Sequence, residues 1–373
     1  MKKLYFVFDQ LPDIKEGGLI SSYINLYNLL KEKYEIHIIS VFNFEKNTTT
    51  FDNNRIHIIN NYKIDNRFYK FFSYIKSLKF KKVGKSILSL FIYFLSIHMN
   101  RKRIKKILKD EDLVIVSCPS AGIFMHKSIK FILEIHTSYK YFFGNNFLGK
   151  LQGKMMTKPT LTLFRTKYDS ENVPKYLNPD YIYNFFDNKD TKRSKTLIKN
   201  KICFVGRIED VKDPLRLITI ANDLRKINKN FILDIYGDGS LLNDCKKKIE
   251  ELNLKNIVNM KGFTTNKNIY SKYTLQLVTS KYEGLPMSII EAKANGIPTI
   301  SNVWGESVKE VINNKVDGFI VNDNEEYVKK INEVLTNEEL QKKLSENAYK
   351  SYNTFSKKEA LKKWLYFLEN YKK

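Results

Sequence analysis

The stretch from Ser280 to Ile300, SKYEGLPMSIIEAKANGIPTI, packs a turn, a helix and the start of a strand into 21 residues. The apolar alternation just before it, from Leu275 to Thr279, predicts a buried strand. Pro286 is typical of a helix start, so Met287 to Ala294 is predicted to be helical, and the glycine and proline that follow end that helix. Close alternation of strands and helices is typical of α/β folds with parallel sheets.

Two glutamates in this stretch, Glu283 and Glu291, point to a ligand. The free N–H groups and positive end of the predicted helix form a natural anion site at the turn. Carboxylates repel an anion, so these two are expected to bind another part of the same ligand, and paired hydroxyls of a sugar and a ribose donate hydrogen bonds to carboxylates. The alternative is that both glutamates are solvated charges at a helix end.

A second stretch, KICFVGRIEDVKDPLRLI from Lys201 to Ile218, has the same strand-loop-helix pattern. Arg207 and Lys212 are expected to project from the loop at the carboxyl end of its strand, where ligands bind in open α/β sheets. Two cations beside a helix N-terminus can hold a diphosphate and stabilise it as it leaves. Alternatively, the two cations are ordinary surface charges.

In order and spacing, the motifs of residues 200–340 resemble those of the retaining GT-B glycosyltransferases of family 4 (glycosyl transferases group 1), of the bacterial surface-polysaccharide type. The motifs are Gly206-Arg207 with Lys212, Tyr236-Gly237-Asp238-Gly239, Lys261-Gly262-Phe263, the Glu283 to Glu291 run, and Gly318-Phe319-Ile320-Val321. In the N-terminal half, Gly17-Gly18 and Ile135-His136-Thr137 match more weakly. Leu285-Pro286 and Trp304-Gly305-Glu306 depart from the family pattern, which puts the identity of the donor sugar in doubt.

The resemblance implies an enzyme with two Rossmann-like, doubly wound parallel-sheet domains that face a cleft. It implies transfer of a hexose or N-acetylhexosamine, with retention of configuration, from a nucleotide-sugar that we expect to be UDP-linked. The implied catalytic residues are Glu283, Lys212, Arg207 and His136. The implied donor-binding residues are Gly17, Gly18, Arg207, Lys212, Gly262, Phe263, Glu283, Gly284, Leu285, Met287 and Glu291.

In these roles Arg207 and Lys212 hold the diphosphate, Glu291 the ribose and Glu283 the hexose. The backbone near Gly262-Phe263 faces the base. His136 follows a predicted strand and, by resemblance, contacts the donor sugar or the acceptor. Taken alone, a histidine there is as often structural. No general base is evident.

Length agrees with two domains, because 373 residues exceed one ordinary core. We expect residues 1–187 to form an N-terminal acceptor domain, 188–355 a donor domain, and 356–373 a helix that packs back on the first domain, with a hinge within 184–199. Predicted strands in the first half are 3–8, 35–41, 113–117 and 131–135. Those in the second half are 202–205, 231–236, 257–260, 275–279, 299–301 and 318–321.

The net charge of +24 is concentrated in residues 63–109, which contain fourteen lysines and arginines and one acid, Asp65, for a net charge of +13. Nine aromatic residues lie among them, a mixture that fits helices lying in the headgroup region of an anionic membrane. The apolar run 86–99 falls short of the roughly 20 residues that span a bilayer. An ordinary buried helix with solvated lysines is the alternative; nucleic-acid binding lacks a supporting motif.

These observations predict a cytoplasmic protein, peripheral on the inner face of the membrane, whose acceptor is a lipid-linked glycan in surface polysaccharide or teichoic acid biosynthesis. No cofactor or metal is expected. The acidic run 110–112 lies before a predicted strand, at the wrong end for the site, and the cations replace a metal. The alternatives are a nucleotide-sugar 2-epimerase of the same architecture and a non-catalytic membrane-associated scaffold.

Overall fold

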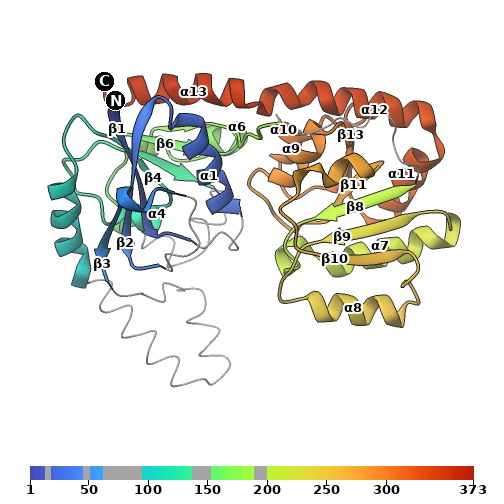
Figure 1. Ribbon diagram of the computed structural model, residues 1–373. Coiled ribbons are helices and arrows are strands. Elements are labelled where there is room, and N and C mark those ends of the chain that lie inside the picture. Colours follow the sequence, from blue (N-terminus) through green and yellow to red (C-terminus); the bar gives the residue numbers. More distant parts are fainter. Residues whose placement is uncertain (13–17, 45–50, 62–94, 137–152, 189–199) are drawn as a thin grey trace, which may run out of the picture. The chain divides into compact units, whose positions relative to one another are not determined.

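The computed structural model describes residues 1–12, 18–44, 51–61, 95–136, 153–188 and 200–373. This part of the chain forms two units (Figure 1). Unit 1 comprises Met1–Ile182 and Leu361–Lys373, and unit 2 comprises Tyr183–Ala360. The change of unit between residues 182 and 183 precedes the expected boundary after residue 187. Most of the expected hinge, 189–199, lies outside the described residues.

Unit 1 has, within its described residues, a parallel sheet of seven strands in the order β3-β2-β1-β4-β5-β6-β7. The strands are β1 (Lys2–Gln10), β2 (Tyr34–Phe42), β3 (Ile56–Asn60), β4 (Leu113–Val116), β5 (Ile132–Ile135), β6 (Leu161–Phe164) and β7 (Pro179–Tyr181). The four strands predicted in this half are confirmed as β1, β2, β4 and β5. The strands β3, β6 and β7 were not predicted from the sequence.

The described helices of unit 1 include α1 (Gly18–Leu30), α4 (Pro119–Gly122) and α6 (Lys167–Glu171), and residues 95–107 are also helical. Short 3₁₀ turns occur at η3 (Asn53–Arg55) and η5 (Lys175–Leu177). Helix α13 (Lys357–Asn370) confirms the helix predicted for the tail, and its Trp364 and Leu368 are buried. Beyond this helix, the Tyr371 hydroxyl accepts a hydrogen bond from the Val114 N–H of β4 at 3.0 Å.

Unit 2 contains a parallel sheet of six strands, among the described residues, in the order β10-β9-β8-β11-β12-β13. They are β8 (Lys201–Val205), β9 (Ile232–Tyr236), β10 (Val258–Gly262), β11 (Leu275–Val278), β12 (Thr299–Asn302) and β13 (Gly318–Val321). All six strands predicted in this half are confirmed. Their near-continuous apolar character fits strands covered on both faces.

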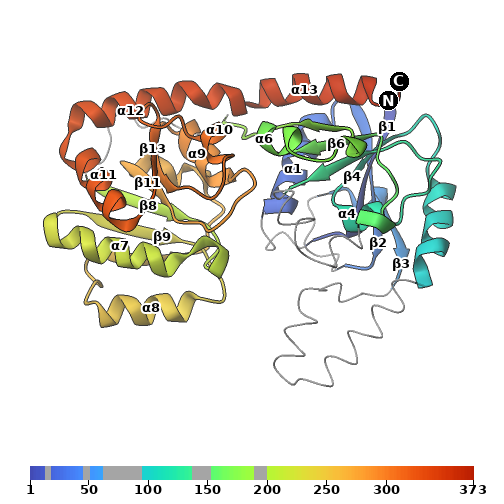
Figure 2. The same cartoon turned by 180° about the vertical axis from the view of Figure 1, so that it is seen from behind.

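Helices cover both faces of this sheet (Figures 1 and 2). They are α7 (Pro214–Ile227), α8 (Leu242–Glu251), α9 (Met287–Ala294), α10 (Val308–Val311), α11 (Asn324–Thr336) and α12 (Glu338–Ser351), with 3₁₀ turns η6 (Asp210–Lys212), η7 (Lys267–Lys272) and η8 (Tyr352–Phe355). Successive residues of β8 face opposite sides. Ile202 and Phe204 pack with α7, α8 and α11, whereas Cys203 packs with η7 and α9.

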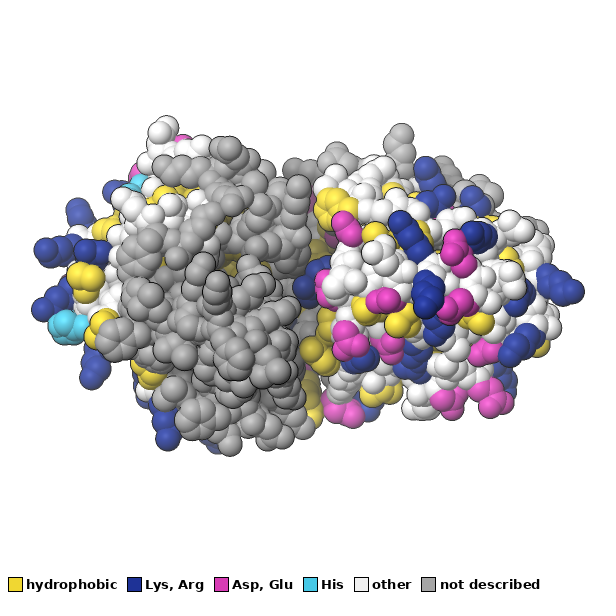
Figure 3. Space-filling view, turned by 90° about the horizontal axis from the view of Figure 1, so that it is seen from below, with side chains coloured by type: hydrophobic (Ala, Val, Ile, Leu, Met, Phe, Trp, Pro, Cys, Tyr) yellow, Lys and Arg dark blue, Asp and Glu magenta, His cyan; other side chains and the backbone are white. Residues whose placement is uncertain are grey.

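The charged side chains are distributed differently over the described surface of the two units. On the face of unit 2 seen in Figure 3, basic and acidic side chains are interspersed, whereas Lys and Arg gather at the left edge, where helix 95–107 lies. Of the basic segment 63–109, residues 63–94 lie outside the described chain. No helix among the described residues is long and apolar enough to cross a membrane.

Candidate active site

The topology of unit 2 indicates a candidate binding site at one end of its strands. The chain runs outward from β8 through β9 to β10 and then returns to place β11 on the other side of β8. In open α/β sheets, ligands bind beyond the carboxyl ends of the two strands between which the order reverses. Those strands are β8 and β11. The loops that follow them contain Arg207, Lys212 and Glu283, three of the predicted site residues.

Backbone contacts join the loop after β8 to its neighbours. The N–H of Gly206 donates to the carbonyl of Tyr236 at 3.0 Å, and the N–H of Gly237 donates to the carbonyl of Gly262 at 2.9 Å. Only glycine fits at 237, where φ is +147° and a Cβ atom would lie 1.9 Å from the Gly206 oxygen. The loops after β8, β9 and β10 therefore form one continuous rim.

Lys212, in the loop that follows β8, forms an ion pair with Glu283, in the loop that follows β11. The hydroxyl of Ser280 donates to the same Glu283 oxygen, Oε1, at 2.6 Å. Thr279 donates from its hydroxyl to the main-chain carbonyl of Lys212 at 2.9 Å, which joins the two loops. The side chains of Lys212 and Glu283 are 18% and 12% exposed, so the pair is largely shielded yet reachable by a ligand. The sequence predicted separate roles for these two residues and did not predict that they touch.

Arg207 is exposed on the same loop. Hydrogen bonds from Ser240, together with the nearby Arg207 charge, lower the pKa of Glu209. Arg207 thus lies at the rim, in the same loop as Lys212. In the described part of the chain the two side chains do not contact each other. Its long side chain can reach a ligand at the sheet edge without losing an existing ion pair.

Helix α9 begins where the sequence predicted. Pro286 is its N-cap and provides no side-chain hydrogen bond, and Met287 is the first helical residue. Gly284 is partly exposed in the preceding turn, whereas Leu285 is buried and its carbonyl accepts a hydrogen bond from the Asn184 amide at 2.9 Å. The start of α9 therefore presents backbone N–H groups beside the loop that contains Glu283.

Glu291 lies one turn into α9 and is only 4% exposed. Its Oε2 accepts a hydrogen bond from the Tyr270 hydroxyl at 3.1 Å. Burial and the charge of Glu291 raise the pKa of Tyr270 well above its ordinary value, so the phenol stays a proton donor. Tyr270 was missed in the sequence, where it stands in a polar segment with no strand or helix periodicity.

Two further predicted positions follow β10. Gly262 has φ of +73° and open space where a Cβ atom would lie, and Phe263 is 64% exposed. An exposed aromatic ring at the carboxyl end of a strand offers a surface on which a planar base can stack.

In unit 1, Gly17 lies outside the described residues, and Gly18 is the first residue of α1. His136 directly follows β5, as predicted. Its Nε2 lies 2.9 Å from an Nη atom of Arg165, and Arg165 also forms an ion pair with Glu134. The ring of Tyr23 lies 5.8 Å from the imidazole ring, centroid to centroid.

Burial and the Arg165 charge lower the pKa of His136 to about 4, so the imidazole is neutral at pH 7. Burial alone would raise the pKa of Glu134, but Arg165 and a hydrogen bond with His136 bring it to about 2. The sequence contained a signal for this cluster. Glu134 stands inside the apolar strand FILEI, and a charged residue in a buried strand requires a partner.

Among the described residues, no group of three or more His, Cys, Asp or Glu side chains is arranged to hold a metal ion. The acidic run 110–112 precedes β4, at the amino end of that strand, as expected. Within it, Asp112 accepts a hydrogen bond from the backbone N–H of Lys109 at 2.9 Å.

Two Rossmann-like units with wholly parallel sheets in one chain are the architecture of the GT-B fold, which the chain shares with solved glycosyltransferases. Residues 186–351 match the model of the family described as glycosyl transferases group 1. The matched residues make up most of unit 2 and contain Arg207, Lys212, Glu283 and Glu291, and together with the relatives below they support the assignment of the chain as a glycosyltransferase.

Relatives and solved structures agree with this assignment. The chain is 26% identical to a Campylobacter jejuni enzyme named GalNAc-alpha-(1->4)-GalNAc-alpha-(1->3)-diNAcBac-PP-undecaprenol alpha-1,4-N-acetyl-D-galactosaminyltransferase, over 98% of both chains. It is 25% identical to poly(ribitol-phosphate) alpha-N-acetylglucosaminyltransferase of Staphylococcus aureus, over 95% of this chain and 79% of that one. A TarM variant of S. aureus, solved with fondaparinux, alpha-GlcNAc-glycerol and UDP, superposes with a TM-score of 0.75 at 17% identity, covering 99% of this chain and 100% of that chain.

Proposed function

We propose that the enzyme transfers a hexose or N-acetylhexosamine from a UDP-sugar, with retention of configuration, to a lipid-linked glycan or a teichoic acid. The observation that carries the proposal is the Lys212–Glu283 pair at the edge where the strand order of unit 2 reverses. A cation and a carboxylate held side by side match a ligand with a phosphate next to a hydroxyl-bearing ring.

The donor roles follow from this geometry. The ammonium of Lys212, the guanidinium of Arg207 and the N-terminus of α9 supply positive charge to the diphosphate, and this charge becomes more valuable as the diphosphate leaves. Lys212 and Ser280 both contact Oε1 of Glu283, so Oε2 can accept from a hexose hydroxyl. Glu291 serves the ribose, with Tyr270 orienting its carboxylate. Phe263 and the backbone at Gly262 face the base.

The neutral imidazole of His136 is suited to hydrogen bonding with a sugar or acceptor hydroxyl rather than to delivering a proton at pH 7. The departing phosphate takes the proton of the acceptor hydroxyl. We propose that no metal ion is needed, since Lys212, Arg207 and the start of α9 supply its electrostatic role.

The acceptor is proposed from charge and from the relatives. The names of two relatives specify an undecaprenol diphosphate glycan and a poly(ribitol-phosphate), both of which carry phosphate. The net charge of +24 favours such an acceptor and an anionic membrane surface, to which residues 63–109 would bind. We therefore place the enzyme on the inner face of the cell membrane as a peripheral protein in surface polysaccharide or teichoic acid biosynthesis.

The test is thermal unfolding and slow donor hydrolysis with a panel of nucleotides and nucleotide-sugars, without added metal and with EDTA. A ligand at a hundredfold excess over its dissociation constant stabilises the folded protein by about 2.7 kcal/mol, a rise of several degrees in the melting temperature. We expect UDP to give this rise and one UDP-sugar to release UDP slowly. Stabilisation by no nucleotide, or hydrolysis only after metal is restored, would contradict the corresponding part of the proposal. Interconversion of UDP-sugars without acceptor would identify an epimerase.

A further inference from the structure

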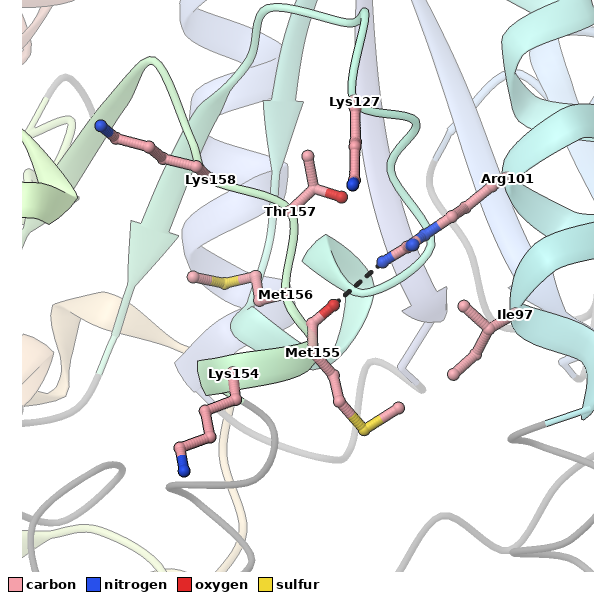
Figure 4. A pocket seen from close by; sticks show the side chains of 8 residues that line it. All are labelled: Ile97, Arg101, Lys127, Lys154, Met155, Met156, Thr157 and Lys158. Carbon is pink, nitrogen blue, oxygen red and sulfur yellow. Dashed lines mark hydrogen bonds between the residues drawn. The ribbon is translucent and has the colours of Figure 1, made fainter.

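A pocket of about 570 Å³ lies in unit 1, and none of the predicted donor-binding residues is among the described residues that line it. Helix 95–107 provides one wall, and the chain segments that precede β5 and β6 provide the others (Figure 4). Its lining residues are Ile97, Arg101, Lys127, Lys154, Met155, Met156, Thr157 and Lys158. Because these segments precede β5 and β6, the pocket lies toward the amino ends of those strands, whereas His136 lies at a carboxyl end.

Arg101 is fixed in this pocket by its own hydrogen bonds. Its Nε donates to the carbonyl of Ile123 at 2.8 Å, and one Nη donates to the carbonyl of Met155 at 2.9 Å. These acceptors are neutral, so they orient the guanidinium without cancelling its charge. Figure 4 shows the Lys127 side chain extending toward the same region, beside Thr157.

The pocket concentrates positive charge. Four of the eight described residues that line it are cationic, and none of the eight is acidic. These positive charges also affect His126. Its pKa is lowered by burial and then by neighbouring cations that include Lys105, Arg101 and Lys127. Bringing like charges together costs energy that a bound anion offsets.

The rest of the lining is apolar and adaptable. Ile97, Met155 and Met156 contribute aliphatic and thioether surface, and methionine side chains adjust to irregular ligands. The Thr157 hydroxyl already donates to the carbonyl of Met125 at 2.6 Å. The cationic side chains are therefore the groups left to bind the polar part of a ligand. Charge beside apolar surface is the complement of an amphiphile with an anionic head.

We propose that this pocket binds the phosphate of a membrane lipid, with Arg101 and Lys127 on the phosphate and the two methionines against its apolar portion. The proposal rests on the proposed peripheral membrane location and deepens it, because it names a defined headgroup site in unit 1. Such a site would hold unit 1 at the bilayer while the donor-binding edge of unit 2 carries out the chemistry.

The test is co-sedimentation of the full chain with phosphatidylcholine vesicles that contain or lack phosphatidylglycerol. Lys127→Glu replaces an exposed cation whose ammonium forms no hydrogen bond with the described part of the chain. One charge at an anionic surface is worth about fivefold in binding, so reversal should weaken partitioning about twentyfold or more. The matched control is Lys33→Glu, the same charge change at an exposed turn of unit 1, which should change partitioning less than twofold.

A second variant tests the apolar part. Met155→Ala keeps the backbone carbonyl that holds Arg101 and should weaken vesicle binding about fourfold, the equivalent of one buried methylene group. Excess soluble glycerol phosphate should compete poorly, because it lacks the apolar portion.

Equal partitioning of Lys127→Glu and Lys33→Glu would overturn the proposal, as would equal binding to vesicles with and without phosphatidylglycerol. Full displacement by soluble glycerol phosphate would show that the site takes free phosphate and not a lipid. The UDP-induced thermal shift, measured on the same variants, should remain unchanged. Its absence in the unmodified chain would refute the donor assignment while leaving the vesicle result valid.

Discussion

Replacing Glu134 by glutamine tests the buried cluster beside His136. Glu134 is fully buried, and its partner Arg165 has a side chain only 5% exposed. The substitution keeps size and shape but removes the negative charge. Arg165 then remains buried without its counter-ion, a situation that costs about 3–5 kcal/mol.

The acidity of Glu134 supplies an independent magnitude. Its pKa falls from an ordinary 4.5 to about 2, because Arg165 outweighs the effect of burial. At 1.36 kcal/mol for each tenfold change in acidity, this fall corresponds to about 3 kcal/mol of stability at neutral pH. With a urea dependence of about 2 kcal/mol per molar, the unfolding midpoint of unit 1 should decrease by about 1.5 M.

Tryptophan fluorescence can follow unit 1 alone. The chain has two tryptophans, and the buried Trp364 belongs to unit 1, so a Trp304→Phe background leaves a single reporter there. The matched control is Glu171→Gln, which breaks an exposed pair with Lys167 at 3.5 Å and should shift stability by less than about 0.5 kcal/mol. Equal midpoints for Glu134→Gln and Glu171→Gln would refute the reasoning.

The same cluster predicts a pH dependence. A carboxyl whose pKa is lowered on folding stabilises the protein above the unfolded pKa and loses that contribution as pH falls toward the folded value. For Glu134 this window runs from about pH 4.5 down to about pH 2. The lowered pKa of His136 has the same sign and extends the decline upward to about pH 6.5. Urea titrations of the unmodified chain between pH 7 and pH 3 should therefore show unit 1 losing stability as the pH falls, and an unchanged midpoint over this range would contradict the prediction.

Two further predictions concern unit 2. Lys212→Ala should reduce donor hydrolysis at least about a hundredfold, whereas Lys281→Ala, which breaks a more exposed ion pair, should leave hydrolysis near normal. Gly237→Ala should destabilise unit 2 by about 2 kcal/mol or more, because its Cβ would meet the carbonyl of Gly206. The matched control is Gly305→Ala, at a similar φ of +154° but with open space around the Cβ position. It has the backbone strain without the collision, so the difference in melting temperature between the two variants measures the collision.

Unit 2 was the more predictable half of the chain. Its six strands lie between glycine, proline and polar residues that mark the ends of elements. These residues end a strand or helix through their effect on a few neighbouring residues, so the local sequence is enough to find them. In unit 1, β6 and β7 went unpredicted, since their segments Leu161–Phe164 and Pro179–Tyr181 mix apolar and polar residues or are too short to show a period. In the sheet β6 pairs with β5, and β7 pairs with β6, so each short strand gains a hydrogen-bonding partner from the tertiary structure.

The candidate site shows the same division. The local sequence placed Arg207 and Lys212 in one loop and Glu283 in another, each after its own strand. It did not predict the Lys212–Glu283 contact, because that contact requires β11 to pair with β8, its neighbour in the sheet but not in the chain. Likewise, the position of His136 after a strand was predicted, but its contact with Arg165 follows from the pairing of β5 with β6.

The amino-acid sequence by itself determined the kind and order of most elements, the loops that hold the cations and carboxylates, and the resemblance of residues 200–340 to a glycosyltransferase family. These properties arise from interactions among residues close together in the chain, such as periodic burial, helix starts and glycine turns. The tertiary structure alone decided which charges meet, which are buried, and where the pocket around Arg101 and Lys127 opens. Contacts of that kind join residues far apart in sequence and depend on strand order and packing, which local patterns do not specify.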